Sequence, residues 1–406
     1  MTPVKLSGRA LRALSPSASA PFLGRITERT ELSEAARAQE ILLLREPPPR
    51  PLPAGFRGYL SFHTGPFDDL PDAYWLASDF RYLEEGDVVR IDPARRSIAT
   101  LYRRRSKANT FLVTERCDNY CIMCSQPPRE RDDGWLVDEL LEALPLISDE
   151  TEEVGITGGE PALLGHRLLD LMGAIHHYLP RTAVHVLSNG RRFAVADFAR
   201  ALGDLRHPDL VVGVPLYSDL PEIHDFVVQA RGAFDETLRG VLNLKRARVR
   251  VELRLVIHRE TYARLPRFAE FVARNLVFAD HVALMGLELM GFARANLDAL
   301  WIDPLDYQAQ LIGAVRILDR ARIPVSVYNH QLCVLAPELH PFARRSISDW
   351  KNMYLDRCAG CSSKADCGGF FASSTLRVSR GISAIVPASP QGASSIHEGA
   401  YVVGST

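Results

Sequence analysis

The sequence predicts an α/β fold in which a parallel, barrel-like sheet carries helices on its outside. From residue 110 onward, strand patterns and helix patterns alternate along the chain. Such alternation is typical of parallel sheets, because each helix returns the chain to the same end of the sheet. A β-rich stretch precedes this alternating region. One group of cysteines lies near the beginning of the alternating region, and a second group lies beyond its end. With 406 residues, 47% of them hydrophobic, the chain can bury one large core and one or two small ones.

The first 108 residues are predicted to form two parts. Residues 1–54 are expected to be irregular, with one amphipathic helix over 29–44 and a stiff proline-rich linker at 47–53. Residues 55–108 are expected to form a small β-rich domain. Within it, 86–92 and 97–102 alternate apolar and polar residues on either side of a turn, which predicts a hairpin.

Residues 109–325 are predicted to form the barrel-like domain. The helical patterns place apolar residues three and four positions apart, so that one face of each helix can pack on a sheet. Six consecutive strand–helix units favour a parallel barrel, whose working site lies at the C-terminal ends of the strands. The six strands are expected at residues 110–114, 153–157, 183–187, 210–216, 250–257 and 281–287.

The seven cysteines form a group of three and a group of four. Cys117, Cys121 and Cys124 have the spacing C-x3-C-x2-C and directly follow the first strand. Three thiolates can hold three irons of a 4Fe-4S cube and leave the fourth iron open for chemistry. Four thiolates can close a 4Fe-4S or a zinc site completely. The second group is Cys333, Cys358, Cys361 and Cys367.

The composition indicates the cellular compartment and argues against several classes of protein. Disulfides are not expected, because seven is an odd number and the chain is not a short secreted scaffold. A reducing cytoplasm is therefore the expected location. The net charge of -1 argues against a nucleic-acid-binding protein. No apolar run approaches the roughly 20 residues that a membrane span needs.

Polar and glycine-rich segments follow consecutive strands and so meet at one rim, beside the cysteine loop. An open iron needs a chelating ligand, and an amino acid offers an amine and a carboxylate. Gly158 and Gly159 would let the backbone approach such a ligand, while Glu160 would act through its side chain or by fixing the turn. Ser188 and Asn189 can hydrogen-bond a carboxylate or ribose hydroxyls. Tyr217 and His224, after the fourth strand, are candidates to face the substrate.

The cysteine spacing followed by Gly-Gly-Glu-Pro after the second strand resembles the radical S-adenosylmethionine (radical SAM) superfamily, over roughly residues 110–300. The resemblance implies a partial (β/α)6 barrel and a 4Fe-4S cluster on Cys117, Cys121 and Cys124. It also implies S-adenosylmethionine on the open iron, with its amino group near Gly158 to Glu160. Met123 stands where the family usually has an aromatic residue, and its thioether can still pack on adenine. Arg254 lies within a strand, where alternation allows it to point into the barrel toward the cofactor carboxylate or outward.

A narrower resemblance, over most of the chain after residue 55, is to the His-Xaa-Ser system radical SAM maturases of the HxsC type. It is carried by residues 114–128, by 346–352 and by the later cysteines with 367–371. It implies a small partner peptide with His-x-Ser repeats, a companion radical SAM maturase, and an electron donor such as flavodoxin or ferredoxin. The C-terminal cysteines, in segment 326–406, are similar to auxiliary-cluster (SPASM or twitch) domains. They leave room for one auxiliary 4Fe-4S cluster, with Cys333 as its fourth ligand and zinc as the alternative.

These observations predict a peptide-modifying radical enzyme. Reductive cleavage of S-adenosylmethionine would give a 5′-deoxyadenosyl radical that abstracts hydrogen from the peptide. Two alternatives stay open: a radical enzyme that acts on a small molecule, and a metal-stabilised binding protein without catalysis.

Overall fold

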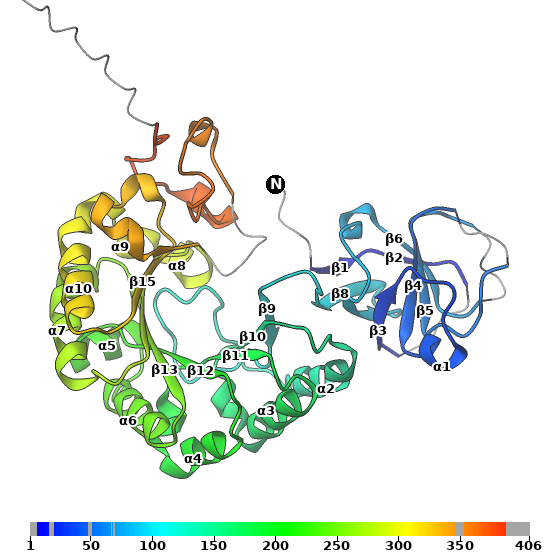
Figure 1. Ribbon diagram of the computed structural model, residues 1–406, viewed down its shortest axis with the longest axis horizontal. Helices are drawn as coiled ribbons and strands as arrows, with labels where there is room; N and C mark the ends of the chain where they lie inside the picture. Colours follow the sequence, from blue (N-terminus) through cyan, green and yellow to red (C-terminus); the bar gives the residue numbers. More distant parts are fainter. Residues whose placement is uncertain are drawn as a thin grey trace, which may run out of the picture.

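The computed structural model describes residues 6–15, 20–47, 51–65, 67, 70–345 and 353–386. Within these ranges the chain forms two sheets, an N-terminal sheet and a curled parallel sheet with helices on its outer side (Figure 1). No helix among the described residues has the length and apolar character to cross a membrane.

The N-terminal sheet closes on itself. Its strand order is β1-β8-β7-β3-β4-β5-β6-β2, so that β1 and β2 lie at opposite edges although only Ala10 separates them in sequence. The backbone N–H of Ala10 donates to Arg96, and its carbonyl accepts from Ala77, which joins the two edges into a small barrel. The strands are β1 (Ser7–Arg9), β2 (Leu11–Ala13), β3 (Phe22–Thr27), β4 (Glu40–Leu44), β5 (Gly58–Ser61), β6 (Ala73–Leu76), β7 (Val88–Asp92) and β8 (Ser97–Tyr102).

The expectation of an irregular segment over residues 1–54 is wrong, because four strands of this barrel lie there. The helix expected over 29–44 is reduced to α1 (Glu34–Arg37), and the apolar run that suggested it is strand β4. Every residue of β4 is buried, since the strand lies between β3 and β5 with packed side chains on both faces. The predicted hairpin is confirmed as the antiparallel pair β7 and β8. Residues 48–50 of the expected linker lie outside the described part of the chain.

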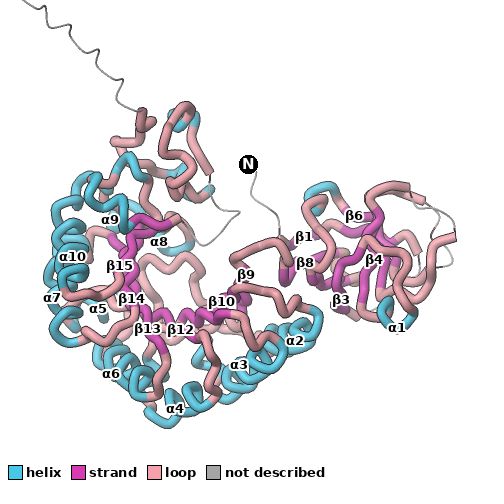
Figure 2. Tube along the Cα trace, viewed as in Figure 1, coloured by secondary structure: helices cyan, strands magenta, loops and turns pink. Residues whose placement is uncertain are grey.

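The second sheet is parallel throughout, with the strands in chain order from β9 to β16. It curls into a half-barrel (Figures 1 and 2). All six predicted strands are confirmed, and β15 and the two-residue β16 extend the sheet. The strands are β9 (Asn109–Leu112), β10 (Glu153–Thr157), β11 (Ala183–Leu187), β12 (Leu210–Pro215), β13 (Arg250–Ile257), β14 (His281–Gly286), β15 (Val325–Tyr328) and β16 (Ala343–Arg344).

Helices cover the outer face of this sheet and bury its outward side chains. In β13, for example, Val251, Leu253 and Leu255 are fully buried in the main core, whereas Glu252 and Arg254 take the alternate positions that face inward. The helices are α2 (Trp135–Ala143), α3 (His166–Tyr178), α4 (Ala196–Asp204), α5 (Pro221–Val228), α6 (Ala233–Arg246), α7 (Leu265–Asn275), α8 (Gly291–Ala295), α9 (Leu297–Leu300) and α10 (Gln308–Arg320).

The N-terminal barrel packs against the first helix of the half-barrel. Leu23 and Val88 belong to the same buried cluster as Val137 and Leu140 of α2. Arg90 makes an ion pair of 3.0 Å with Glu139. The hydroxyl groups of Tyr102 and Thr151 lie 2.8 Å apart in a buried hydrogen bond. Apolar packing thus joins the two sheets, and these directional polar contacts help to fix their relative orientation.

Replacing Tyr102 with Phe tests this junction. Thr151 already donates to the carbonyl of Ser148, so Tyr102 is the donor and the change removes one buried hydrogen bond. We expect the free energy of unfolding to fall by about 1 kcal/mol, measured by chemical denaturation. Tyr178→Phe, on an exposed side chain of α3, should leave it unchanged. Equal effects of the two substitutions would show that the bond contributes nothing.

Candidate active site

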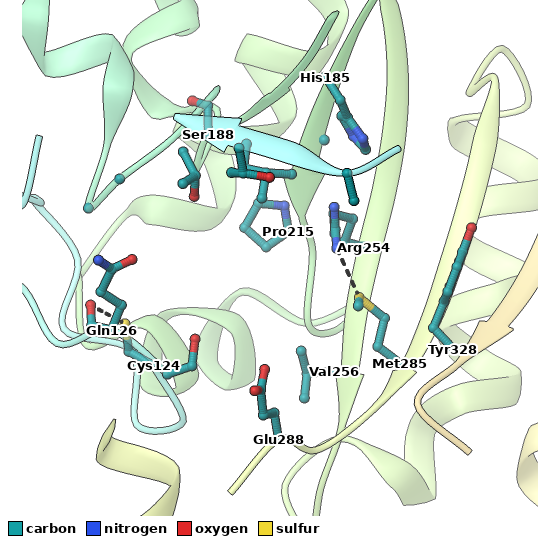
Figure 3. Close-up of a pocket in the computed structure, with 18 of the residues that line it drawn as sticks. Cys124, Gln126, His185, Ser188, Pro215, Arg254, Val256, Met285, Glu288 and Tyr328 are labelled. Atoms are coloured by element: carbon teal, nitrogen blue, oxygen red, sulfur yellow. Dashed lines mark hydrogen bonds between the residues drawn. The ribbon is translucent and has the colours of Figure 1, made fainter. Parts of the chain in front are cut away.

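A cavity of about 750 Å³ lies along the inner face of the half-barrel and extends to the C-terminal ends of the parallel strands. Its wall includes all three cysteines of the first group, the segment after β10 and the turn after β11. Figure 3 shows Cys124 and Ser188 among them. Sequence segments far apart in the chain thus meet at one place, at the edge where parallel-sheet enzymes place their working groups.

The cysteine loop follows β9 and is held by backbone contacts on several sides. The N–H groups of Tyr120 and Ile122 donate to the carbonyls at the end of α5, each at 3.0 Å. The carbonyl of Cys124 accepts from Phe292 of α8 at 2.8 Å. At the start of the loop, the buried carboxylate of Asp133 accepts from the backbone of Glu115 at 2.5 Å. These contacts fix the position of the loop.

The three thiols are free and lie close enough to affect one another. Burial raises the pKa of Cys117 to about 12, and burial followed by the charges of Cys124 and Cys117 raises the pKa of Cys121. Metal ligation requires deprotonated thiols, and bound irons would stabilise these buried thiolates with their positive charge. No group of three His, Cys, Asp or Glu side chains among the described residues is spaced to hold a single metal ion. A cube takes one thiolate per iron, so its ligands need not converge on one point, and the trio fits such a cluster.

Gly158 and Gly159 run alongside the cysteine loop. The N–H of Gly159 donates to Thr114 at 2.9 Å, and the N–H of Glu160 donates to Arg116 at 2.8 Å. A Cβ on Gly158 would lie 2.5 Å from the carbonyl oxygen of Thr114, and one on Gly159 would lie 2.2 Å from that of Arg116. Both glycines also line the cavity. Close packing on the loop therefore requires glycine at both positions, whatever ligand the cavity holds.

Glu160 is fully buried and ties the third strand to the second. Its carboxylate accepts from Ala162 N–H at 2.8 Å, from Ser188 Oγ at 2.7 Å and from Asn189 N–H at 2.5 Å. Burial raises the pKa of Glu160 to about 7, against the lowering effect of these bonds. Asn189 in turn donates its side-chain amide to Asp118 of the cysteine loop at 2.6 Å. Glu160 thus fixes the turn at 188–190, and Asn189 links that turn to the loop.

Met123 and Tyr217 are buried next to each other in a small apolar cluster, and both line the cavity. Burial, and then the charges of Cys121 and Cys124, raise the pKa of Tyr217 well above its usual range, so its hydroxyl stays neutral. His224 lies behind this residue: its Nδ1 accepts from the N–H of Tyr217 at 3.3 Å, and its side chain is 1% exposed. Tyr217 therefore reaches the cavity, while His224 supports it.

Arg254 points into the barrel, which settles the direction that alternation left open (Figure 3). Sequence reasoning missed its neighbours on the same inner face, His185, Glu252 and His281. The signal was present in β13, where Glu252 and Arg254 interrupt an otherwise apolar strand at every second position.

The second cysteine group lies beyond β15. Cys333 comes five residues after the end of that strand, and it packs with Cys358 against Val334, Phe370 and Ile382. Burial raises the pKa of Cys333, and the charges of Cys367 and Cys358 raise it further, which places these three thiols near one another. The backbone N–H of Ile385 lies 3.4 Å from the sulfur of Cys361. Phe371, four residues after Cys367, lines the cavity. Segment 346–352, which carries part of the HxsC-type resemblance, lies outside the described residues.

Glu160→Gln tests the anchor of the rim. Three N–H or O–H donors surround the carboxylate, and the amide would place its own NH2 against at least one of them. We expect the free energy of unfolding to fall by about 1–3 kcal/mol in chemical denaturation. Glu260→Gln, in an exposed turn, is the matched control and should have no effect. Equal stability of the Glu160→Gln variant and the wild type would contradict the anchoring role.

Comparison with known proteins assigns residues 111–272 to the Radical SAM superfamily by its family model. None of the curated proteins matches the sequence. Among solved structures, SuiB of Streptococcus suis bound to S-adenosylmethionine is 14% identical, with a TM-score of 0.45, over 58% of this chain and 53% of SuiB. Native anSMEcpe with bound AdoMet and a Cp18Cys peptide is 16% identical, with a TM-score of 0.42, over 53% of this chain and 62% of its own. HydG, described as a maturase of the FeFe-hydrogenase, is 11% identical, with a TM-score of 0.41, over 55% of this chain and 52% of HydG.

The chain thus spans about half of the length of SuiB and of HydG. The segment matched by the family model contains the three cysteines, the Gly-Gly-Glu segment and the Ser-Asn turn that meet around the cavity. This chain therefore carries a radical SAM domain over residues 111–272.

Proposed function

We propose that the protein is a radical SAM enzyme that modifies a small partner peptide of the His-Xaa-Ser type. The observation that carries the proposal is the meeting of Cys117, Cys121 and Cys124 with the Gly158–Glu160 segment and the 188–189 turn around one cavity. When bound, a 4Fe-4S cluster and S-adenosylmethionine supply a 5′-deoxyadenosyl radical, and the protein supplies position and exclusion of water.

We assign the protein's own residues as follows. Cys117, Cys121 and Cys124 would ligate the cluster. Gly158 and Gly159 expose backbone beside the cysteine loop, and Glu160 keeps Ser188 and Asn189 at the rim, where they would hydrogen-bond the cofactor. Met123 and Tyr217 offer apolar surface next to the cysteines for the adenine ring.

A peptide substrate is supported by the extent of the cavity. Its wall continues from the cysteine loop to Leu6 and Leu101 of the N-terminal barrel, well beyond the residues assigned to the cofactor. Leu101 belongs to β8, which precedes the edge strand β9 of the half-barrel. This gives an extended substrate a surface to lie along, and it favours a peptide over a small molecule. The His-Xaa-Ser type itself rests on the sequence resemblance.

Cys333, Cys358, Cys361 and Cys367 are proposed to hold one auxiliary 4Fe-4S cluster, with zinc as the alternative. The packing of Cys333 with Cys358, and the mutual influence of three of the thiols, support a shared site. Because Phe371 of the same segment lines the cavity, this site would lie near the substrate.

Anaerobic reconstitution tests the metal assignment. We expect about eight irons per chain, and about four in a variant with Cys117, Cys121 and Cys124 changed to Ala. A variant with Cys358, Cys361 and Cys367 changed to Ala should also hold about four. Formation of 5′-deoxyadenosine with a reductant should be lost in the first variant. Stoichiometric zinc in place of iron in the wild type would contradict the radical enzyme and favour a metal-stabilised binding protein.

Mass spectrometry of a co-expressed peptide tests the substrate. A candidate peptide with His-x-Ser repeats should change in mass with the wild type and stay unchanged with the Cys117, Cys121 and Cys124 variant. The sign of the change distinguishes loss of hydrogen from addition of a group. An unmodified peptide, under conditions in which 5′-deoxyadenosine forms, would contradict a peptide of this type as the substrate.

A further inference from the structure

The inner face of the half-barrel carries a group of charged and polar side chains away from the cysteines. They come from three strands on the two sides of β12: His185 of β11, Glu252 and Arg254 of β13, and His281 of β14. Branched apolar side chains normally fill the interior of such barrels. Burying charged groups costs free energy unless they are paired, so a charged interior indicates a ligand or a role in the reaction.

Glu252 is the centre of this group. Its Oε2 lies 2.7 Å from Nδ1 of His281, and Nε2 of His281 lies 2.9 Å from the hydroxyl of Ser326. Its other oxygen, Oε1, lies 3.4 Å from the guanidinium of Arg254 and 3.5 Å from Nε2 of His185. Burial would raise the pKa of Glu252, but the bond from His281 and the charge of Arg254 lower it below its usual value. The carboxylate is therefore ionised, and one of its oxygens is held by His281.

His185 faces the cavity as a neutral ring. Burial lowers the pKa of His185 to about 4, despite the nearby charge of Glu252. The negative charge at 3.5 Å favours a proton on Nε2, which leaves a lone pair on Nδ1. Gly213 makes room for this arrangement, because a Cβ there would lie 2.8 Å from His185 Nε2 and 3.1 Å from Arg254 Cδ. His185 and Arg254 thus sit next to each other across a glycine of β12.

Arg254 has donors to spare. A guanidinium carries five N–H groups. The contacts of Arg254 among the described residues are the ion pair with Glu252 at 3.4 Å and a hydrogen bond of 3.3 Å to the sulfur of Met285, a weak acceptor. The side chain is 16% exposed, and that exposure is to the cavity. Arg254 therefore offers N–H donors to a ligand.

These residues lie apart from the side of the cavity that we assign to the cofactor. In Figure 3, Arg254, His185, Met285 and Tyr328 stand on one side, whereas Cys124 and Gln126 of the cysteine loop stand on the other. Tyr217 lies between the two sides, because the charges of Cys121, Cys124 and Arg254 all act on its hydroxyl. The Arg254 side is thus separate from the cysteine side of the cavity.

We propose that His185, Glu252, Arg254 and His281 form a substrate subsite that binds an amide group, with Arg254 donating to its carbonyl and His185 accepting from its N–H. The inference rests on the proposed function, since a peptide is the substrate that carries such groups. The charges favour a neutral ligand. A carboxylate would stand beside the carboxyl groups of Glu252 and Glu153, and a cation would meet Arg254. An amide matches one donor with one acceptor and adds no charge.

Binding of synthetic peptides separates this subsite from a cofactor role for Arg254. The probe is the His-x-Ser peptide used above, titrated calorimetrically into reconstituted protein without reductant, alongside S-adenosylmethionine. Arg254→Met should raise the dissociation constant of the peptide about tenfold or more and leave that of S-adenosylmethionine within twofold. Arg250→Met is the matched control, because Arg250 lies on the same strand but is exposed and paired with Asp209. It should change neither constant.

A second arm identifies the amide. Single backbone amides of the peptide are replaced by esters, and single Asn or Gln side chains by Asp or Glu. One replacement should weaken binding to the wild type about as much as Arg254→Met does, and should weaken binding to that variant no further. An ester points to a main-chain amide, and an acid to a side-chain amide. Glu252→Gln, which keeps the volume of the side chain, repeats the test if Arg254→Met fails to fold.

Three results would overturn the subsite. In the first, the peptide binds the wild type and Arg254→Met equally. In the second, Arg254→Met weakens the binding of S-adenosylmethionine and not that of the peptide. In the third, every replacement in the peptide weakens binding to Arg254→Met as much as it weakens binding to the wild type. Failure of the proposed function would look different. Then 5′-deoxyadenosine would not form, or the wild type would bind the peptide no better than a scrambled peptide.

Discussion

The site depends on one contact, the pairing of the Gly158–Glu160 backbone with the cysteine loop. Two hydrogen bonds, from Gly159 to Thr114 and from Glu160 to Arg116, continue the parallel pairing of β9 and β10 past the ends of both strands. The approach is so close that a Cβ on either glycine would overlap a carbonyl oxygen of the loop. This pairing positions Cys117. The carboxylate of Glu160, at the end of the paired segment, reaches across to the end of β11. A single short segment thus sets the relative position of three strand ends.

The parallel sheet was predictable because its signals are local. Each strand is a short apolar run between helical patterns, and the cysteine spacing can be read from the sequence alone. The N-terminal barrel was not, because its first strands are three residues long and its closure depends on pairs distant in sequence, such as Leu11 with Leu76. Strand β4 misled for a related reason. When both faces of a strand are buried, alternation disappears, and a run such as Ile41–Leu44 looks like a helix.

Within the site, sequence reasoning found groups that follow strands and missed groups inside them. Gly158, Ser188 and Asn189 stand out as turn residues at the ends of strands. The partners of Glu160 could not be inferred, since they depend on the register of β10 with β11. The inner-face residues His185 and His281 were hidden because one polar residue in a strand gives no direction. His281 lies beside Glu252 because the register of β13 and β14 pairs these two residues directly.

The same register gives the cavity two chemically different sides, and that difference bears on how a radical enzyme controls its substrate. The cysteine side presents backbone, thiols and apolar surface around Met123. The far side presents charged side chains, with Glu252 held by His281 and facing Arg254. A radical can abstract only a hydrogen that lies within its reach, so fixing the substrate at a second point away from the reacting atom contributes to selectivity. Rigid strands place that second point more reliably than loops do, because the pleat and the pairing fix each side chain. On the proposed function, the charged interior of β13 would aim the substrate, while the cysteine loop and the Gly158–Glu160 segment would hold the source of the radical.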